Sequence, residues 1–371
     1  MRSLRKHNKR ILLVIYGKIT FGGVSIFLNN ILSNMDKEGF VITLYAFGYV
    51  EEEAVFQNYI DTGVKVIVGN LRDYNRKRIA WDLFKIMFFK KFDIIHVNTG
   101  GLDLTYLSLL IAKYCGIKQR IAHSHAVKLS PKPYNEWEIK CQKRISKLAT
   151  MKLSCSKQAS EHLYGNPDAI FISNGISTNK FSFNPDIREK TRNELNLQGK
   201  YVIGDVGRLD NNKNQSFILD IANELKKYID VSILLVGNGV NRDELEKKAE
   251  AMGLKNDTVF VAANDHVEYY LNALDVFIQP SHAEGLSISA VEAQAMDLPV
   301  WCSTAIPEQA RITEKFYIMD LDEGAEAWAK QILDYLRNND YENRRDRSED
   351  VREKGFDIVL SAQKMRDIYL E

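Results

Sequence analysis

The sequence predicts an α/β fold made of two doubly wound parallel-sheet domains. Short apolar runs rich in β-branched residues alternate with longer helical patterns along the whole chain, which is typical of βαβ units. The runs form two series, separated by a polar, turn-rich segment after residue 173. Because ligands bind outside the carboxyl ends of strands in such sheets, the loops after these strands are candidate sites.

The strands predicted in the first series are 11–17, 41–47, 64–69, 93–98, 120–124, 151–156 and 169–173. Those predicted in the second series are 201–207, 231–237, 258–263, 276–280, 300–304 and 316–320. The predicted domains are 1–180 and 181–355. A charged helical segment at 356–371 could pack back on the N-terminal domain.

The composition is that of an ordinary globular protein. The chain has 371 residues, 45% apolar and 27% charged, and 50 basic against 49 acidic side chains disfavour a dedicated nucleic-acid binder. Basic residues in MRSLRKHNKR precede an apolar run too short for a secretory signal. No apolar stretch approaches the roughly 18 residues of a membrane span. Four cysteines without C-x-x-C spacing fit free thiols in a cytoplasmic protein.

The loop GRLDNNKNQ (207–215) follows a predicted strand directly. Gly207 allows a close backbone approach at the strand end, Arg208 supplies a planar fork of donors, and Lys213 supplies a point charge. Two cations at the mouth of a parallel sheet suit a phosphate or a diphosphate. The alternative is that both are solvated loop charges.

The stretch PSHAEGLSISAVEAQAMDLPV (280–300) places two glutamates eight residues apart. A helix is predicted to start near Ser287, and the unpaired N–H groups and dipole of its first turn form an anion site. Glu292 lies in the second turn among small residues, where a buried carboxylate needs hydrogen-bond partners. Ribose hydroxyls would supply them. In the alternative, Glu292 is exposed and Glu284 is only a turn residue.

These segments together resemble a known family. The combination of GRLDNNKNQ, LLVGNG, FISNGISTNKF and DVFIQPSHAEGLSISAVEAQAMDLPV is similar to the retaining glycosyltransferases of the family 4 type, in their bacterial capsular and exopolysaccharide branch. The resemblance covers at least residues 10–340. It implies a GT-B fold, in which two Rossmann-like domains face a central cleft that holds a nucleotide-sugar. No cofactor and no metal ion are expected.

The resemblance also implies roles for single residues. Arg208 and Lys213 would bind the donor diphosphate and stabilise its developing charge. Glu284 would contact hydroxyls of the donor sugar, and Glu292 would hold the ribose. The donor phosphates would meet backbone amides of Gly285, Leu286 and Ser287.

Three positions depart from the family pattern. Asp297 stands where glycine is usual, Asn214 stands where glycine often follows the lysine, and Ser177 stands where the linker often has aspartate. Asp and Asn tolerate a left-handed backbone better than most residues, so the fold accommodates them. The first two are expected near the donor site, where they could alter the nucleotide or sugar preference.

In the first half, Gly22 and Gly23 lie between a strand and an amphipathic helix, and the resemblance places this loop near the donor phosphates and the acceptor. The pair is not G-x-G-x-x-G, which counts against a dinucleotide cofactor. His123 and His125 lie on the same side of an extended segment. By register His125 matches the family's histidine near the reaction centre, whereas His96 is expected in the core or at the edge of the cleft. A metal triad of these histidines is disfavoured because no carboxylate ligands accompany it.

The function predicted from these features is metal-independent, retaining transfer of a hexose from a nucleoside diphosphate sugar, UDP-linked, to a polysaccharide or lipid-linked glycan precursor. The alternatives are a GT-B sugar-nucleotide epimerase and a catalytically silent nucleotide-binding partner of a polysaccharide assembly complex. Residues 1–10 and 75–93 mix basic with apolar side chains and suit contact with the inner face of the cell membrane. For 75–93, a core-facing helix with a charged edge is the alternative.

Overall fold

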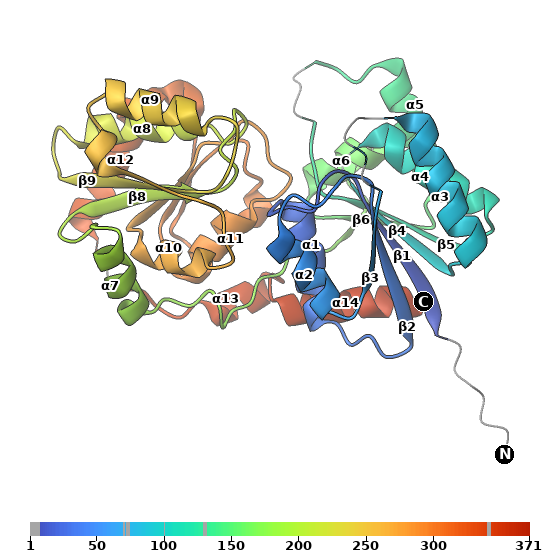
Figure 1. The fold of residues 1–371 in the computed structure, drawn as a ribbon. Helices are drawn as coiled ribbons and strands as arrows, with labels where there is room; N and C mark the ends of the chain where they lie inside the picture. Colours follow the sequence, from blue (N-terminus) through green and yellow to red (C-terminus); the bar gives the residue numbers. More distant parts are fainter. Residues whose placement is uncertain (1–7, 70, 72–74, 100, 129–131, 340–342) are drawn as a thin grey trace. The chain divides into compact units, whose positions relative to one another are not determined.

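The computed structural model describes residues 8–69, 71, 75–99, 101–128, 132–339 and 343–371. Contacts divide the chain into an N-terminal domain, Met1–Gly175 with Ile358–Glu371, and a C-terminal domain, Ile176–Asp357. These divisions fall beside the boundaries predicted at 180 and 355. Figure 1 shows each domain as a parallel sheet with helices on both faces, so the predicted fold class is confirmed.

The N-terminal domain has a seven-stranded parallel sheet of order β3-β2-β1-β4-β5-β6-β7. Its strands are β1 (Lys9–Ile15), β2 (Phe40–Ala46), β3 (Lys65–Val68), β4 (Ile94–Thr99), β5 (Gln119–Ser124), β6 (Met151–Ser154) and β7 (Ile170–Phe171). The central strands β1 and β4 are buried on both faces. These two strands therefore require continuous apolar runs rather than alternating apolar and polar residues.

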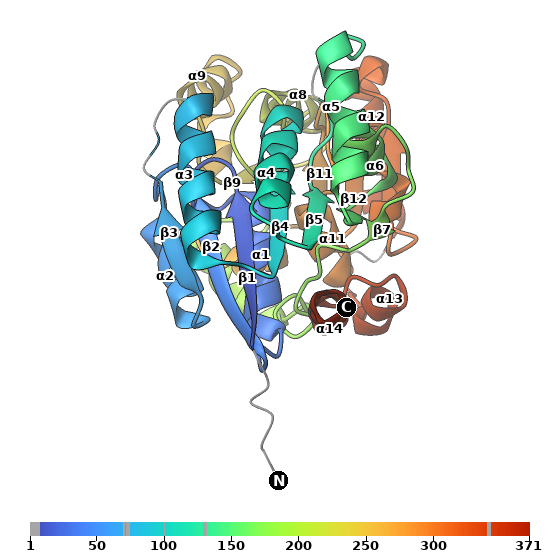
Figure 2. The same ribbon diagram turned by 90° about the vertical axis from the view of Figure 1, so that its right-hand side faces the viewer.

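Helices cover both faces of this sheet. They are α1 (Gly23–Asn34), α2 (Glu53–Asp61), α3 (Arg76–Lys90), α4 (Leu102–Tyr114), α5 (Glu136–Leu148), α6 (Lys157–Tyr164) and α14 (Ile358–Leu370). Two of the starts follow from local sequence: Asn75 caps α3 through the N–H of Arg78, and Asn135 with Glu138 forms a capping box on α5. Figure 2 shows α3, α4 and α5 side by side on one face.

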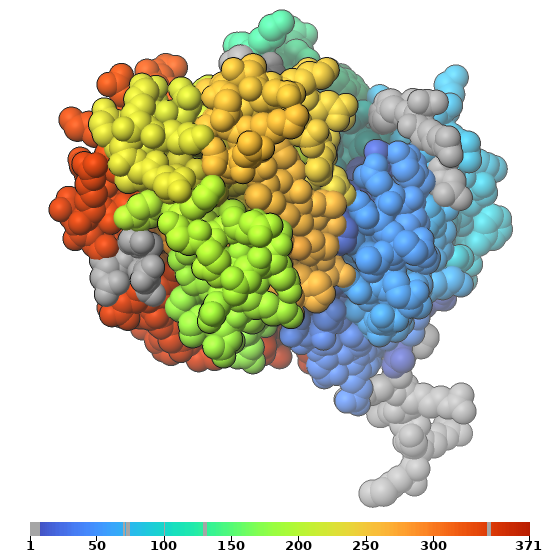
Figure 3. Space-filling model, turned by 60° about the vertical axis from the view of Figure 1, so that its left-hand side comes forward, coloured from blue at the N-terminus to red at the C-terminus, as the bar shows by residue number. Residues whose placement is uncertain are grey.

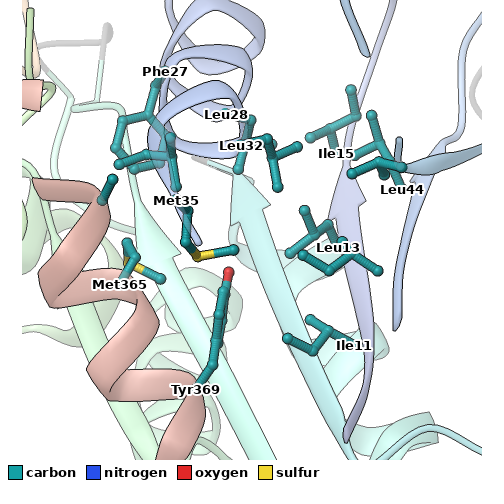
Figure 4. Packing of buried hydrophobic residues seen from close by; sticks show 14 of the residues in the cluster. Ile11, Leu13, Ile15, Phe27, Leu28, Leu32, Met35, Leu44, Met365 and Tyr369 are labelled. Carbon is teal, nitrogen blue, oxygen red and sulfur yellow. The ribbon is translucent and has the colours of Figure 1, made fainter. Parts of the chain in front are cut away.

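The C-terminal helix α14 belongs to the N-terminal core. It packs against α1, and Figure 4 shows Met365 and Tyr369 reaching toward Met35 and the apolar side chains of β1. Burying each such side chain contributes about 1.5–3 kcal/mol. The last helix of the chain is thus an integral part of the first domain.

The C-terminal domain has a six-stranded parallel sheet of order β10-β9-β8-β11-β12-β13. Its strands are β8 (Tyr201–Val206), β9 (Val231–Val236), β10 (Thr258–Val261), β11 (Val276–Gln279), β12 (Val300–Ser303) and β13 (Phe316–Met319). This order is the Rossmann order, in which the chain reverses direction across the sheet after the third strand. Every strand predicted from the sequence is present in one of the two sheets.

The helices of this domain are α7 (Pro185–Glu194), α8 (Gln215–Leu225), α9 (Arg242–Ala251), α10 (Val267–Ala273), α11 (Ile288–Ala295), α12 (Gly324–Asn338) and α13 (Ser348–Glu353), with short 3₁₀ turns at Lys255–Asp257, Glu308–Ala310 and Leu321–Glu323. Helices α8, α9 and α12 lie on one face of the sheet, and α10 and α11 lie on the other (Figure 1). Helix α7 packs against α10 (Figure 3).

None of the helices in the described ranges combines the length and apolar composition that a bilayer crossing needs. Cys115, Cys141, Cys155 and Cys302 are free thiols, as the sequence predicted.

Candidate active site

The candidate donor residues of the C-terminal domain lie where its strand order reverses. Strands β8 and β11 are neighbours in the sheet, although about seventy residues separate them in sequence. Because the strands are parallel, the loop after β8 and the loop after β11 leave the sheet at the same edge. Such switch points are the usual ligand sites of open α/β sheets.

Backbone and side-chain hydrogen bonds hold these two loops together. The N–H of His282 donates to the carbonyl of Asn212 at 2.8 Å. The Asn212 amide donates to the carbonyl of Ala283 at 2.9 Å, and the Asn214 amide donates to that of Pro280 at 3.2 Å. Asn212 and Asn214 of the predicted phosphate loop thus anchor this loop to the loop after β11, which carries Glu284.

Lys213 and Glu284 meet in this junction. Lys213 Nζ lies 2.7 Å from Glu284 Oε1, and both side chains are largely buried. Burial alone would lower the pKa of Lys213, but the carboxylates of Glu284 and Asp205 raise it above its ordinary value. Lys213 is therefore a fixed positive charge at the carboxyl edge of the sheet.

Arg208 has a different environment. Its side chain is 66% exposed, and its guanidinium lies 3.2 Å from the carboxylate of Asp210 in the same loop. An exposed pair of this kind is weak, on the order of 0–1 kcal/mol. Arg208 is therefore able to exchange Asp210 for another anion, although in this structure it does not contact Lys213 or Glu284 among the described interactions.

Asp205 was not predicted as a site residue. It lies near the end of β8, fully buried, and accepts a hydrogen bond from Gln215 at 2.9 Å, while its other oxygen has no partner among the described residues. Burial raises its pKa to about 6, and Lys213 and Gln215 oppose that rise. Gln215 also donates to the carbonyl of Arg208 at 2.9 Å. Gln215, the last residue of the motif GRLDNNKNQ, therefore connects Asp205 to the backbone of Arg208.

The motif LLVGNG supports the same loop from the side. A Cβ atom at Gly237 would lie 1.8 Å from the carbonyl oxygen of Gly207, and one at Gly239 would lie 2.0 Å from that of Leu209. Only glycine allows this approach. Gly237 and Gly239, in the loop after β9, thus fix the backbone on both sides of Arg208. At Gly207 itself an added Cβ would make only ordinary contacts, so packing does not require glycine there.

Helix α11 starts as predicted. Ser287 is its N-cap and accepts from the N–H of Ala290 at 3.2 Å. The Ser287 hydroxyl also donates to Gln279 at the end of β11. Gly285 and Leu286 are buried just before the helix. The positive end of the helix dipole therefore lies in the loop that carries Glu284.

Glu292 is buried in α11, with 9% of its surface exposed. Among the described hydrogen bonds and ion pairs, none involves its carboxylate. Burial raises its pKa to about 8, with Lys180 lowering it and Glu268 raising it. Lys180, from the linker, lies 3.2 Å from Glu268. The alternative in which Glu292 is exposed is therefore wrong, and a buried carboxylate requires a hydrogen-bond partner.

The departures from the family pattern behave differently from one another. Asn214 and Asp297 have φ of 55° and 53°, so both occupy the left-handed region that glycine favours. Asn214 belongs to the phosphate loop. Asp297 lies at the opposite end of α11 from Ser287, and its buried carboxylate pairs with Arg347 at 2.6 Å and with Lys315 at 2.8 Å. The expectation that Asp297 lies near the donor site is therefore wrong; it joins α11 to the segment before α13.

In the N-terminal domain, the three predicted histidines form one cluster. Tyr369 of α14 hydrogen-bonds His96 at 2.7 Å, and His96 hydrogen-bonds His123 at 3.3 Å. The ring centroids of His123 and His125 are 4.0 Å apart, and Asn98 lies 3.1 Å from Nε2 of His125. His96 is fully buried, as expected of a core residue.

Burial holds these rings neutral. It lowers the pKa of His96 and of His125 to about 3 and that of His123 well below its ordinary value. Nδ1 of His125 has no partner in the described structure. With Nε2 donating to Asn98, Nδ1 is an acceptor for a hydroxyl. Across the described residues, no group of three or more His, Cys, Asp or Glu is arranged to hold a metal ion.

Gly22 and Gly23 are linked to the histidines through one aromatic residue. Gly22 is the N-cap of α1, which begins at Gly23. Phe27, one turn further, packs against His123 and His125 with ring centroids 5.2 and 4.8 Å away. A Cβ at Gly23 would meet no described atom within 4 Å, so packing alone does not explain the glycine.

Two family profiles match the chain. Residues 21–180 match the profile described as Glycosyltransferase Family 4, and residues 187–354 match the profile described as Glycosyl transferases group 1. The chain belongs to the GT-B glycosyltransferases of family 4.

Several curated proteins named as glycosyltransferases are similar to this chain. EpsF of Bacillus subtilis (strain 168) is 28% identical over 65% of this chain, and the match spans 65% of that protein. The UDP-Gal:alpha-D-GlcNAc-diphosphoundecaprenol alpha-1,3-galactosyltransferase of Escherichia coli is 25% identical over 86% of this chain and 87% of its own length. CapH of Staphylococcus aureus, a capsular polysaccharide biosynthesis glycosyltransferase, is 24% identical over 80% and 82%.

Solved structures share the fold. The crystal structure of Anabaena Alr3699/HepE in complex with UDP and glucose matches with a TM-score of 0.79 at 18% identity, over 97% of this chain and 98% of that one. WaaG, a glycosyltransferase involved in lipopolysaccharide biosynthesis, matches with a TM-score of 0.67 at 14% identity, over 97% and 99%. The likeness extends over both domains, as a GT-B fold requires.

Proposed function

We propose that this glycosyltransferase moves a hexose from a UDP-sugar to a polysaccharide or lipid-linked glycan precursor, with retention of configuration and without a metal ion. One observation carries the proposal: Lys213, Glu284 and the N-terminus of α11 come together at the β8–β11 switch point. At this edge of the sheet, the cation and the helix amides suit the phosphates of a sugar diphosphate, and the carboxylate suits the hydroxyls of its sugar.

The donor diphosphate would bind between Lys213, Arg208 and the backbone amides of Gly285, Leu286 and Ser287. Bond cleavage places negative charge on the leaving diphosphate, so fixed positive groups at this point lower the barrier. Removing one donor of this kind typically costs a factor of 10²–10³ in rate, roughly 3–4 kcal/mol. Arg208 would leave Asp210 to join the site, since their exposed pairing is weak.

The two glutamates would bind the two sugars of the donor. Glu292 would accept hydrogen bonds from the ribose hydroxyls, which supplies the partner that its buried carboxylate lacks among the described residues. Glu284 would bind hydroxyls of the transferred hexose once the phosphates draw Lys213 away from it. An oxygen of the leaving group would take the acceptor proton, and His125 would position donor or acceptor through its free Nδ1.

The UDP donor is supported by two proteins similar to this one. The galactosyltransferase of Escherichia coli is named for a UDP-linked donor and a diphosphoundecaprenol acceptor, and the structure of Alr3699/HepE contains UDP. These properties belong to those proteins. For this chain they select UDP as the first nucleotide to test.

The test is thermal unfolding with UDP, GDP or ADP in the presence of EDTA, followed by UDP release from UDP-hexoses. UDP at 100 times its dissociation constant should stabilise the fold by about 2.7 kcal/mol. Arg208→Ala and Glu292→Ala should remove that shift. Conversion of the UDP-hexose into its epimer without any acceptor, with the UDP still attached, would favour the epimerase. Binding of UDP with neither UDP release nor conversion would favour the silent partner. NMR of the product gives its anomeric configuration, and inversion would refute retention.

A further inference from the structure

Helix α3 is apolar on both of its faces. Its inner face packs on the N-terminal sheet through Ile79, Leu83 and Met87, which are all buried. On its outer face Trp81, Phe88 and Phe89 are 59%, 55% and 75% exposed. A surface helix of a globular protein ordinarily carries polar side chains there. The outer aromatics therefore need an explanation other than the core.

These aromatic side chains form one continuous stripe. The ring centroids of Trp81 and Phe84 are 6.1 Å apart, those of Phe84 and Phe88 are 5.3 Å apart, and those of Phe88 and Phe89 are 5.4 Å apart. Single exposed apolar residues are common on proteins, whereas contiguous patches mark sites of interaction. The stripe follows the spacing of one helix face.

Cations are interleaved with the stripe. Helix α3 contains five basic residues, Arg76, Lys77, Arg78, Lys85 and Lys90, against the single acidic residue Asp82. The ammonium group of Lys85 lies 5.7 Å from the ring centroid of Trp81. The apolar surface and the positive charge thus share one face of the helix.

Helix α5 carries a second patch of the same composition. Trp137 and Ile139 are both about two-fifths exposed, and a hollow beside them is lined by Lys140, Lys143, Arg144 and Lys147 with Glu136 and Ile139. The guanidinium of Arg76 lies 5.5 Å from the ring of Trp137, which connects the two helices. Helices α3, α4 and α5 cover the same face of the N-terminal sheet (Figure 2).

We propose that this face, formed by the outer residues of α3 and α5, docks on an anionic lipid bilayer. Trp and Phe enter the boundary between headgroups and acyl chains, while Lys and Arg reach the anionic headgroups. A protein partner fits less well, because interface cores are depleted of Lys and here lysines alternate with the aromatics. The inference depends on this surface and is independent of the donor site. The basic residues 1–7, also predicted to contact the membrane, lie outside the described residues.

The experiment is flotation of the full-length protein with vesicles of phosphatidylcholine, alone or with phosphatidylglycerol. Wild-type protein should float with the anionic vesicles and should be released by salt, because headgroup attraction is screened. Lys77→Gln with Lys85→Gln should lower the partition coefficient roughly 30-fold, since each cation near such a surface contributes about fivefold. Trp81→Ser with Phe88→Ser should abolish flotation. All four side chains are exposed, so the midpoint temperature of thermal unfolding should be the same in the variants as in the wild type.

Matched controls lie in the C-terminal domain. Lys330→Gln with Lys354→Gln removes two exposed lysines, and Tyr228→Ser removes an aromatic ring that is 63% exposed. Neither should change flotation. Absence of flotation by the wild type, or equal loss in control and test variants, would overturn the proposal. Sedimentation identifies the rival occupant: dimers that dissociate on Trp81→Ser with Phe88→Ser, without lipid binding, would assign the face to a second copy of the chain.

Discussion

Lys213 Nζ lies 2.7 Å from Glu284 Oε1, although the two residues belong to loops that follow different strands. The pair exists because β8 and β11 are adjacent and parallel, so that both loops leave the same edge. In the absence of donor, Glu284 neutralises the cation that the proposed diphosphate would engage. Donor binding would then exchange one anion for another at Lys213.

Lys213→Ala should slow sugar transfer by a factor of 10²–10³, because one fixed positive group near the leaving diphosphate is lost. The measurement is the rate of UDP release with donor and acceptor. Lys248→Ala is the matched control: Lys248 also forms a 2.7 Å ion pair, with Asp220, but joins α9 to α8. A comparable loss of rate in both variants would assign the effect of Lys213 to general stability.

UDP binding should release a proton through Glu292. Burial raises the pKa of its carboxyl to about 8, so at pH 7 the free protein holds it mostly protonated. Hydrogen bonds from ribose hydroxyls favour the ionised form and lower the pKa. Affinity should therefore rise with pH, up to about tenfold per unit, and level off above pH 8.

Isothermal titration calorimetry in two buffers of different ionisation enthalpy measures this proton directly. At pH 7 the wild type should release up to about one proton per UDP. Glu292→Gln keeps the shape of the side chain and removes its titration, so its proton release should be smaller by that amount. An identical pH dependence in the two proteins would exclude Glu292 from the ribose site.

The fold follows from the sequence because its strand signals are strong and local. Continuous apolar runs bounded by turn residues predicted all strands of both sheets, and Ser287 marked the start of α11. Lys213 and Glu284 could be placed at one edge of the sheet because the carboxyl ends of parallel strands lie at the same edge. That they meet at 2.7 Å depends on β8 lying beside β11, which local patterns do not encode.

Other parts of the site depend on partners remote in sequence. Asp205 has the position of an ordinary strand residue, and only its contact with Gln215 connects it to the phosphate loop. Asp297 faces Arg347, fifty residues later, and no periodicity links the two. The pattern of α3 allowed two orientations, and the exposure of Trp81 shows that apolar residues occupy its outer face as well as its inner one.

Asp297→Ala should destabilise the C-terminal domain by about 3–5 kcal/mol, because it removes the buried carboxylate that pairs with Arg347 and Lys315. The affinity for UDP should not change, since Asp297 lies at the end of α11 remote from Ser287. Chemical denaturation and UDP titration test both parts. Asp297→Asn preserves tolerance of the left-handed backbone and should fall between wild type and alanine. Weaker UDP binding by a folded variant would return Asp297 to the donor site.

The histidine cluster should make the N-terminal domain sensitive to acid. Burial keeps the pKa of His123 well below its ordinary value of 6.5. Below pH 6.5 the unfolded chain binds a proton that the folded protein excludes, so each such histidine costs about 1.4 kcal/mol of stability per pH unit. The neighbouring rings of His96 and His125 and the Tyr369 hydroxyl offer no negative charge that would offset this.

The comparison that isolates this effect is between wild type and His123→Asn, by chemical denaturation at pH 7, 6 and 5. At pH 7 the wild type should be more stable, because asparagine leaves part of the ring's volume empty. As the pH falls below 6.5 the wild type loses stability by about 1.4 kcal/mol per unit more than the variant, so the difference between the two proteins should narrow. His282→Asn, at an exposed loop position, should follow the wild type throughout. A constant difference between wild type and His123→Asn would mean that His123 titrates alike in the folded and unfolded states, which its burial at 0% exposure opposes.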